Sequence, residues 1–471
     1  MNKTKMIVTI GPKSNNDEII KEMILNGADV IRINMSYASF EEAKNIILSV
    51  RKLNLELGVQ TGIMIDTLGP EIKIGNLEKP KVELKKDSLI RIVCNEIVGN
   101  SEIVPITEKS AIEKCELADE IYLNNGEVKV TVLNKDKDTL ICTVNNDGII
   151  KPNSTVNIKN TTIDIPFLSK YDKECIEFAS NYEADYIALS HVRDSLDVLD
   201  VNDLLINLNN SNMQIISKIE NKSAIDEIDN ILKVSDGIMV SRGDLGLEFE
   251  IEKIPSVQKR IASLTKENGK ICIIATEMLA SMQYNIRPTR AEVSDVANSV
   301  LDKTDAVMLS GETAIGEYPI ETVKTMNKII EEIEKEINYN DLLKTIDRKE
   351  KIDISKAISY SAVDSANRVD AKAIVCSTLS GLTAKDISNY IPSCPVIATS
   401  PIDKVVRGLT INYGIIPFLV PNCNTTDELI ESSVKTAKKL LDLKKGDKIV
   451  IAGSFPMTIN YTNFLKIEEI K

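Results

Sequence analysis

Short apolar runs alternate with helical patterns through most of the chain. The first runs lie at 6–10, 29–33 and 61–66, and helical patterns at 16–26 and 40–57 separate them. Strand-helix-strand alternation of this kind is typical of βαβ units, in which successive strands are parallel. The sequence therefore predicts that the chain begins as a parallel α/β structure.

The pattern changes between residues 70 and 165. β-Branched stretches such as IRIVC, VKVTVL and LICTV are separated there by Asn-Gly, Asp-Gly and Lys-Asp turns. Short strands with turns of this type favour antiparallel pairing. We expect residues 69–166 to form a small all-β domain of the β-barrel type, inserted into the α/β structure as a lid.

Helix-strand alternation resumes near Tyr171 with five further apolar runs. These runs lie at 185–189, 213–217, 235–240, 271–275 and 304–309. With the three runs before the insertion they make eight, the number that a TIM (β/α)8 barrel requires. We expect residues 1–68 and 167–340 to form this catalytic barrel.

The remaining part, residues 341–471, starts a new alternation of helices and strands. Its strands are expected at 372–376, 395–399, 415–420 and 447–452, and a final run at 464–468 fits an antiparallel edge strand. This order is typical of an open, doubly wound α/β domain.

Polar residues end or follow the predicted barrel strands at their carboxyl ends, where TIM barrels carry their active sites. They are Arg32, Asn34, Ser36, Asp66, Thr67, Ser190, Lys218, Glu220, Gly243, Asp244, Thr276, Ser310 and Glu312. One such residue alone is usually the first residue of a loop. Polar groups after seven of the eight strands instead indicate a functional site.

Two neighbouring runs, IISKIEN (215–221) and DGIMVSRGDLG (236–246), form the centre of this prediction. A helix expected at 221–233 would make their strands parallel, so that Lys218, Glu220 and Asp244 converge. One ammonium and two carboxylates suit Mg²⁺ or Mn²⁺ beside an anionic ligand. The alternative is a simple ion pair between Lys218 and Glu220. The second carboxylate, Asp244, is the reason to favour a metal site.

The chemistry that suits these groups is phosphoryl transfer. Arg32 can bind a phosphate through two hydrogen bonds, and Lys218 can neutralise charge on the moving phosphoryl group. Four further oxygen-bearing residues suit a monovalent cation: Asn34, Ser36, Asp66 and Thr67. Asn34 and Ser36 also fit ordinary turn and cap chemistry before the helix at 40.

Composition narrows the class of partner. The formal net charge is −13 and the isoelectric point is about 5.0, which disfavours nucleic acid and anionic membranes as partners. The eight cysteines are scattered without a CxxC motif, so buried reduced thiols are expected. No signal peptide or membrane-spanning length of apolar residues is evident, and a cytoplasmic protein is expected.

The motifs resemble those of the pyruvate kinase family along nearly the whole chain. They are TIGPKS (9–14), RINMS (32–36), DTLGPEI (66–72), SKIEN (217–221), GIMVSRGDLG (237–246), ATEML (275–279), RPTRAEVSDVAN (287–298) and AVMLSGETA (306–314). The domain order is also similar. The chain resembles a divergent, bacterial-type member without the family's N-terminal helical extension.

The resemblance implies transfer of phosphate from phosphoenolpyruvate to ADP, giving pyruvate and ATP in glycolysis. It implies that Glu220 and Asp244 ligate Mg²⁺ or Mn²⁺, and that Lys218 and Arg32 act on the phosphoryl group. It also implies a backbone site for the substrate carboxylate at Gly243–Asp244, and a proton donor positioned by Thr276.

A potassium site and an oligomer are implied in the same way. Asn34, Ser36, Asp66 and Thr67 would ligate K⁺, and Glu71 matches the form found in K⁺-requiring members. The protein would be a cytoplasmic homotetramer. STLSGLTA (377–384) resembles the family's effector-phosphate loop, with Thr378, Ser380 and Thr383 as candidate contacts, although a structural helix start explains it equally.

The chain departs from the family motifs at several positions, and several of these lie on the side expected to hold the nucleotide or in the inserted domain. Tyr37 replaces a histidine, Leu68 a lysine, Lys73 an arginine and Asn124-Asn125 two aspartates. The stretch STVNIKN (154–160) lacks a lysine and the final glycine of the family motif, Glu277 replaces a glutamine, Ala280 a glutamate and Ile315 a lysine. We therefore expect weakened or altered nucleotide use. A catalytically impaired paralogue with a regulatory or structural binding role is the alternative, and enolate chemistry with another acceptor is a third hypothesis.

The chain has a single histidine, His191, where the family usually has phenylalanine. It directly follows Ser190 at the end of a predicted barrel strand. A histidine packed at the strand end is expected there, not a catalytic one.

Overall fold

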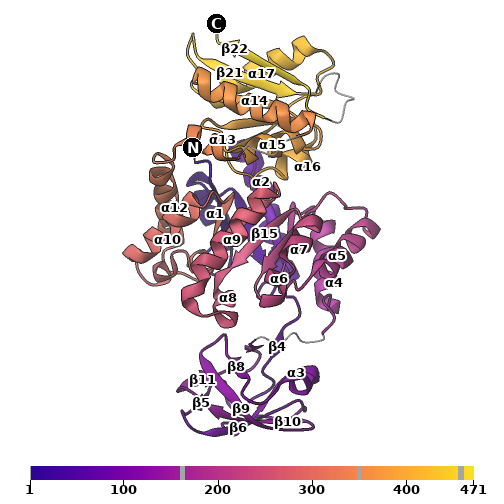
Figure 1. Cartoon of the computed structure of the whole chain (residues 1–471), viewed down its shortest axis with the longest axis vertical. Helices are drawn as coiled ribbons and strands as arrows, with labels where there is room; N and C mark the ends of the chain where they lie inside the picture. Colours follow the sequence, from indigo (N-terminus) through magenta and orange to yellow (C-terminus); the bar gives the residue numbers. More distant parts are fainter. Residues whose placement is uncertain (1, 160–164, 347–351, 455–460) are drawn as a thin grey trace.

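The computed structural model describes residues 2–159, 165–346, 352–454 and 461–471. Three parts follow one another along the long axis of the molecule (Figure 1). A barrel with surrounding helices lies in the middle, the inserted β domain lies at one end, and the C-terminal α/β domain lies at the other.

Eight parallel strands close the barrel in the order β1-β17-β16-β15-β14-β13-β3-β2. Their bounds are Lys5–Thr9 (β1), Val30–Asn34 (β2), Gly62–Asp66 (β3), Tyr186–Leu189 (β13), Gln214–Ile219 (β14), Gly237–Ser241 (β15), Ile271–Ala275 (β16) and Ala306–Leu309 (β17). The predicted TIM barrel is thereby confirmed.

Helices follow the strands and form the outer ring. Their bounds are Asp17–Leu25 (α1), Phe40–Leu57 (α2), Lys170–Asn181 (α4), Ser195–Asn207 (α5), Lys222–Asp226 (α6), Ile228–Val234 (α7), Arg242–Glu248 (α8), Ile254–Glu267 (α9), Arg290–Leu301 (α10), Gly311–Ala314 (α11) and Pro319–Glu334 (α12). Short 3₁₀ turns lie at Ile251–Lys253 and Ala280–Gln283.

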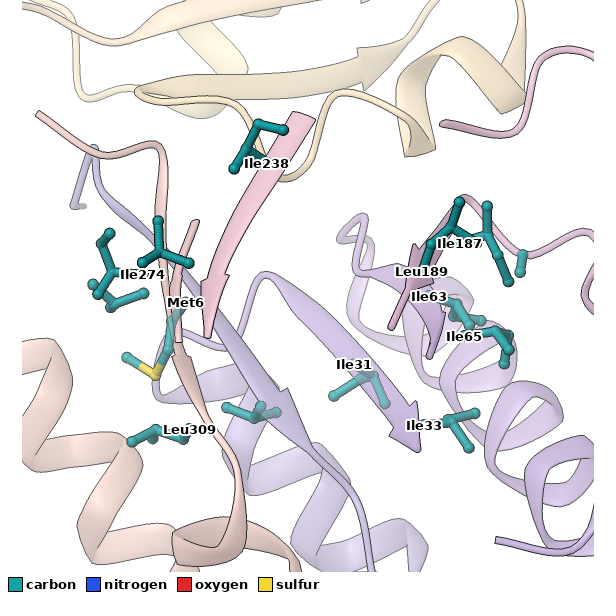
Figure 2. Close-up of a cluster of buried hydrophobic side chains, with 14 of the residues drawn as sticks. Met6, Ile31, Ile33, Ile63, Ile65, Ile187, Leu189, Ile238, Ile274 and Leu309 are labelled. Carbon is teal, nitrogen blue, oxygen red and sulfur yellow. The ribbon is translucent and has the colours of Figure 1, made fainter. Parts of the chain in front are cut away.

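Alternation along each strand places one set of side chains under the helices and the other set inside the barrel. Ile31, Ile33, Ile63 and Ile65 belong to the outer set and are fully buried against the helical layer (Figure 2). Ile7, Val30, Met64 and Ile216 belong to a separate inner cluster that fills the barrel. The strands are therefore buried on both sides, which explains their continuous apolar runs.

The inserted domain leaves the barrel after β3. Its strands form a seven-stranded sheet of order β4-β12-β8-β9-β10-β6-β7 and a β11-β5 pair. The bounds are Ile72–Lys73 (β4), Val82–Leu84 (β5), Leu89–Val93 (β6), Ile103–Pro105 (β7), Glu120–Leu123 (β8), Val128–Asp136 (β9), Thr139–Val144 (β10), Gly148–Ile150 (β11), Thr155–Ile158 (β12) and one helix, Lys109–Lys114 (α3).

The C-terminal domain is an open sheet of order β20-β19-β18-β21-β22. The predicted edge strand β22 (Phe464–Glu469) pairs antiparallel with β21 (Lys448–Gly453), as expected. The other elements are Ala373–Ser377 (β18), Val396–Ser400 (β19), Ile415–Leu419 (β20), Tyr339–Ile346 (α13), Ile354–Val369 (α14), Leu382–Asn389 (α15), Asp403–Arg407 (α16) and Thr426–Leu440 (α17).

This domain closes the amino end of the barrel. Ile411 belongs to the inner cluster of the barrel, and its amide donates to the hydroxyl of Tyr186, the first residue of β13. Arg407 reaches the same strand start through Asp185, with 2.9 Å between Nε and Oδ1. The opposite, carboxyl end of the barrel stays open toward the inserted domain.

Two local predictions were wrong. The helix expected at 221–233 is broken into α6 and α7 at Glu227. The strand expected to end at residue 217 continues to Ile219, so Lys218 lies within β14 and not after it.

Candidate active site

A cavity of about 1240 Å³ opens at the carboxyl ends of the barrel strands. One wall comes from the barrel, including Arg32, Lys218, Glu220 and Asp244, and the other from residues 151–158 of the inserted domain. The strand ends and the lid therefore enclose one site, where the sequence predicted it.

Lys218 occupies the floor of this cavity. Ile216 faces the barrel interior, so the alternation of β14 directs Lys218 and Glu220 inward as well. The Lys218 ammonium lies 3.0 Å from Oε1 of Glu220 and 3.3 Å from Oδ1 of Asp66. It also donates to Ser190 Oγ over 2.8 Å.

These contacts keep the lysine charged. Burial alone would favour the neutral amine, but the carboxylates of Asp66 and Glu220 outweigh it and raise the pKa of Lys218 well above its ordinary value. The cavity therefore holds a fixed cation that does not titrate near neutral pH.

Arg32 lies beside this lysine and shares its carboxylate partner. Its Nε is 2.6 Å from Oδ2 of Asp66, and Nη1 donates to Thr9 Oγ1 over 2.9 Å. Because Arg32 also lines the cavity, its remaining N–H groups can reach an anion there. The two predicted phosphate-binding cations are thus held together by one buried aspartate.

Glu220 and Asp244 form an acidic pair on the same wall. Burial favours the neutral acid at both, yet Lys218 and His191 outweigh this effect and lower the pKa of Glu220. At Asp244, burial and the charge of Glu220 raise the pKa instead. Asp244 accepts one hydrogen bond from Ser241 Oγ over 2.7 Å.

This acidic pair fits a divalent cation. Two carboxylates that disfavour each other's charge would both be stabilised by a bound Mg²⁺ or Mn²⁺. Among the described residues no group of three or more potential ligands from His, Cys, Asp and Glu could hold a metal alone. Magnesium commonly takes one or two carboxylates and completes its shell with substrate oxygens and water.

Thr276 stands opposite, at the end of β16. Its hydroxyl accepts a hydrogen bond from the Gly243 amide over 2.9 Å and donates to the Ala275 carbonyl over 2.7 Å. The amide predicted to bind a substrate carboxylate is thus engaged by Thr276 here. The structure does bring Gly243, Asp244 and Thr276 together.

Only two of the four predicted potassium ligands line the cavity. Asn34 and Ser36 line the cavity, whereas Asp66 and Thr67 are buried outside its lining. The register of β2 and β3 pairs Asn34 with Asp66. Asn34 Oδ1 accepts from the Ser36 amide over 3.0 Å, which is the turn chemistry considered as the alternative.

Glu312, also singled out after the eighth strand, is not a free ligand. Its carboxylate accepts from the backbone amides of Leu279 and Ser310, over 3.1 and 2.8 Å. Ser310 lines the cavity, and its Oγ is buried without a hydrogen-bond partner among the described residues. This hydroxyl can accept or donate a bond to a ligand.

His191 has a larger part in the site than the sequence indicated. Its imidazole is mostly buried, as expected, but it lines the cavity with Nδ1 3.2 Å from Oε2 of Glu220. Nε2 lies 3.7 Å from Oε1 of Glu71. Burial opposes its protonation, but Glu220, Glu71 and Asp244 outweigh burial and raise the pKa of His191 to about 9. Its position directly after Ser190 was the only sequence signal.

The departures on the nucleotide side lie where they could affect a ligand. Most of them line the cavity: Tyr37, Leu68, Lys73, Asn124, Asn125, residues 154–158, Glu277 and Ile315. Ala280 is not part of the cavity lining, and residue 160 lies outside the described residues. Nζ of Lys73 is 3.3 Å from Oε2 of Glu71, and Tyr37 is 86% exposed. The mouth of the cavity thus contains fewer cations than the family motifs would supply.

The candidate effector loop uses its hydroxyls internally. Thr378 Oγ1 accepts from the Gly381 amide over 2.9 Å, and Ser380 Oγ accepts from the Leu382 amide over 3.4 Å. Thr383 is hydrogen-bonded to the hydroxyl of Thr462. These contacts support the structural helix start, and effector binding stays a prediction.

The closed barrel with a charged cavity at its carboxyl end defines an enzyme of the (β/α)8 class. Residues 1–323 match the family described as pyruvate kinase, barrel domain, and residues 356–468 match pyruvate kinase, alpha/beta domain. The chain therefore belongs to the pyruvate kinase family and is a phosphotransferase.

Relatives and a solved structure support the assignment. Pyruvate kinases of Clostridium acetobutylicum and Clostridium perfringens are each 41% identical over 100% of this chain and 100% of their own length. The crystal structure of a pyruvate kinase from Cryptosporidium parvum superposes with a TM-score of 0.94 at 34% identity, covering 99% of this chain and 96% of that one. None of these findings indicates impaired catalysis, so the impaired paralogue is not favoured.

Within the part of the chain that the structure describes, no helix has the length and apolarity needed to cross a membrane.

Proposed function

We propose that this protein transfers the phosphoryl group of phosphoenolpyruvate to ADP, giving pyruvate and ATP. The observation that supports this most is the buried Lys218 ammonium, fixed by Glu220, Asp66 and Ser190 beside an acidic pair. A phosphoryl group in flight carries charge on its oxygens, and a preorganised cation in a water-poor site stabilises it.

The proposal gives separate roles to the residues at the ends of the barrel strands. Arg32 binds the phosphate, Lys218 stabilises the transferring phosphoryl group, and the Gly243–Asp244 backbone holds the substrate carboxylate. The Thr276 hydroxyl exchanges its bond to the Gly243 amide for one to the proton donor that quenches the enolate.

Two cations complete the proposed site. Glu220 and Asp244 would hold Mg²⁺ or Mn²⁺, which supplies a positive charge to the phosphoryl and enolate oxygens when bound. Asn34, Ser36, Asp66 and Thr67 would hold K⁺. Since Asp66 already contacts Arg32 and Lys218, K⁺ would share this carboxylate with them.

The acceptor side of the site is proposed to be altered. With Leu68 and Ile315 in the cavity wall where the family motifs have lysines, two cations that could bind a nucleoside diphosphate are missing. A weak or broad preference among diphosphates follows. A cytoplasmic homotetramer is also proposed, by analogy with the family.

A lactate-dehydrogenase-coupled assay with Mg²⁺ and K⁺, run over a panel of nucleoside diphosphates, tests this proposal. Pyruvate formation that depends on both phosphoenolpyruvate and a diphosphate is expected. A low KM for ADP would contradict the altered nucleotide site. Binding of phosphoenolpyruvate without turnover would restore the paralogue hypothesis, and enolpyruvate-dependent proton exchange without nucleotide would favour another acceptor.

A further inference from the structure

The turn that carries Thr276 is conformationally strained. Thr276 and Glu277 have φ angles of 66° and 54°, two successive residues in the left-handed region. This region is unfavourable for residues other than glycine, and most of all for a β-branched residue such as Thr276. Such a conformation persists only where surrounding contacts hold it.

Arg242 provides those contacts from outside the cavity. Its Nε and Nη2 donate to the Thr276 carbonyl over 3.2 and 2.6 Å, and Nη2 lies 3.0 Å from Sδ of Met278. Nη1 donates to Asp295 of α10. The guanidinium is almost fully buried, and Arg242 does not line the cavity.

Arg242 and its neighbour hold Thr276 at two points. Arg242 binds the carbonyl, and the Gly243 amide binds the hydroxyl. The strand end that delivers Asp244 to the acidic pair is therefore tied directly to the turn that delivers Thr276. Displacement of the carbonyl would rotate the peptide and shift the hydroxyl.

We propose that Arg242 is a positioning residue that fixes the Thr276 hydroxyl for protonation of the enolate. This rests on the role of Thr276 in the proposed function. Arg242 is not part of the cavity lining, so it is assigned no contact with substrate or cation. It acts by holding a strained backbone in the geometry that proton delivery requires.

The chemistry of the side chain explains why arginine is needed. A planar guanidinium can donate two N–H groups to one carbonyl while a third reaches Asp295. A lysine at this position could replace one of these hydrogen bonds, but it could not form both bonds to the carbonyl and the bond to Asp295 together. Glutamine can donate to the carbonyl but lacks the charge that pairs with Asp295.

The test compares Arg242→Gln and Arg242→Lys with the unmodified chain. The readouts are kcat, KM for phosphoenolpyruvate, Mn²⁺ affinity, and exchange of the pyruvate methyl protons with D₂O followed by NMR. For R242Q we expect kcat and methyl exchange to fall together by about 10- to 100-fold, as a catalytic group moves by about 1 Å. KM and Mn²⁺ affinity should change less than about threefold, and R242K should lie between.

Arg407→Gln is the matched control. Arg407 has the same 9% side-chain exposure as Arg242 and is also paired with aspartate, but it lies at the far end of the barrel. Its loss should lower the unfolding temperature without lowering methyl exchange. If R242Q does not fold, Asp295→Asn, which frees one arm of the guanidinium, should lower exchange by a smaller factor.

Unchanged methyl exchange in folded R242Q or in D295N would overturn the proposal. So would a parallel loss of exchange in R407Q, because the effect would then reflect stability alone. Failure of the proposed function is distinguishable, since the unmodified chain would then form no pyruvate from phosphoenolpyruvate with any nucleoside diphosphate.

Discussion

Nζ of Lys218 lies 3.0 Å from Oε1 of Glu220, with both side chains buried in the mouth of the barrel. Each charge compensates the other in surroundings where neither has full access to water. A buried pair of this kind loses much more when one partner is removed than when both are neutralised. A substitution in this pair is therefore expected to change both the stability of the fold and the activity of the site.

Lys218→Met should abolish phosphoryl transfer and also destabilise the fold. We expect kcat to fall by at least about 10²- to 10³-fold, because the fixed cation is lost from the transition state. Breaking the pair should cost about 3–5 kcal/mol of unfolding free energy. Rapid-quench kinetics and urea denaturation measure the two effects. The double variant K218M/E220Q should regain stability but not activity, and equal destabilisation in both variants would contradict the compensation.

Asp244→Asn should weaken binding of Mn²⁺ by about 10- to 100-fold, judged from the usual effect of losing one part of a metal site. Electron paramagnetic resonance of free Mn²⁺ measures this without any turnover. Asp226→Asn is the control, since Asp226 also lines the cavity but was assigned no ligand role. Equal affinities in D244N and the unmodified chain would exclude this carboxylate as a ligand.

Metal binding should release protons in acidic buffer. The pKa of Asp244 is raised by burial and by Glu220, so part of the population is protonated below neutral pH in the absence of metal. Mn²⁺ must displace that proton. Calorimetry in buffers of different ionisation enthalpy should show proton release that grows from neutral toward acidic pH. A pH-independent proton count would contradict the raised pKa.

His191 should stabilise the fold more in acidic than in alkaline solution. Its pKa of about 9 lies above the value of about 6.5 expected in the unfolded chain. The contribution is therefore complete below about pH 6.5 and is lost as pH rises through about 9. Urea denaturation of the unmodified chain and of His191→Phe at about pH 6 and about pH 9.5 measures it. The stability difference between the two proteins should shift in favour of His191→Phe at the higher pH.

The cysteines should divide into two groups in reactivity. Cys94 and Cys423 are half-buried, and the other six are buried: Cys115, Cys142, Cys175, Cys272, Cys376 and Cys394. Burial raises the pKa of Cys115 to about 12, which leaves almost no thiolate at neutral pH. An aromatic disulfide reagent should modify at most two thiols quickly in the native protein and all eight after unfolding. Fast native modification of Cys115 would contradict its burial.

The inward direction of Lys218 and Glu220 at the floor of the cavity could be predicted from the sequence, because it follows from strand periodicity. Ile216, Lys218 and Glu220 occupy alternate positions of one run, so an inward apolar residue fixes the direction of both charged ones. The position of Asp244 beside these residues could be predicted as well, because it follows the adjacent parallel strand. The error at Lys218, placed after the strand instead of within it, did not change the direction of its side chain.

The contacts of His191 could not be predicted in this way. Its φ of 57° places it in the left-handed region, so strand alternation no longer gives its direction. One of its partners, Glu71, lies at the start of the inserted segment, and the distance between them depends on how that segment leaves the barrel. The left-handed backbone at Thr276 could not be predicted either. It is held by hydrogen bonds from Arg242, and not by the local conformational preference of threonine.

Ile411 and Arg407 have a consequence for protein engineering. The barrel receives part of its inner packing and of its amino-end hydrogen bonds from residues more than 90 positions beyond its last strand. A chimera that joins this barrel to the last domain of a relative would need a compatible side chain at each of these docking positions. Without them, the graft would leave the apolar interior of the barrel uncovered at its amino end, and Asp185 would keep Arg51 but lose Arg407 as an ion-pair partner. The yield of folded chimera would then depend on this interface more than on the linker.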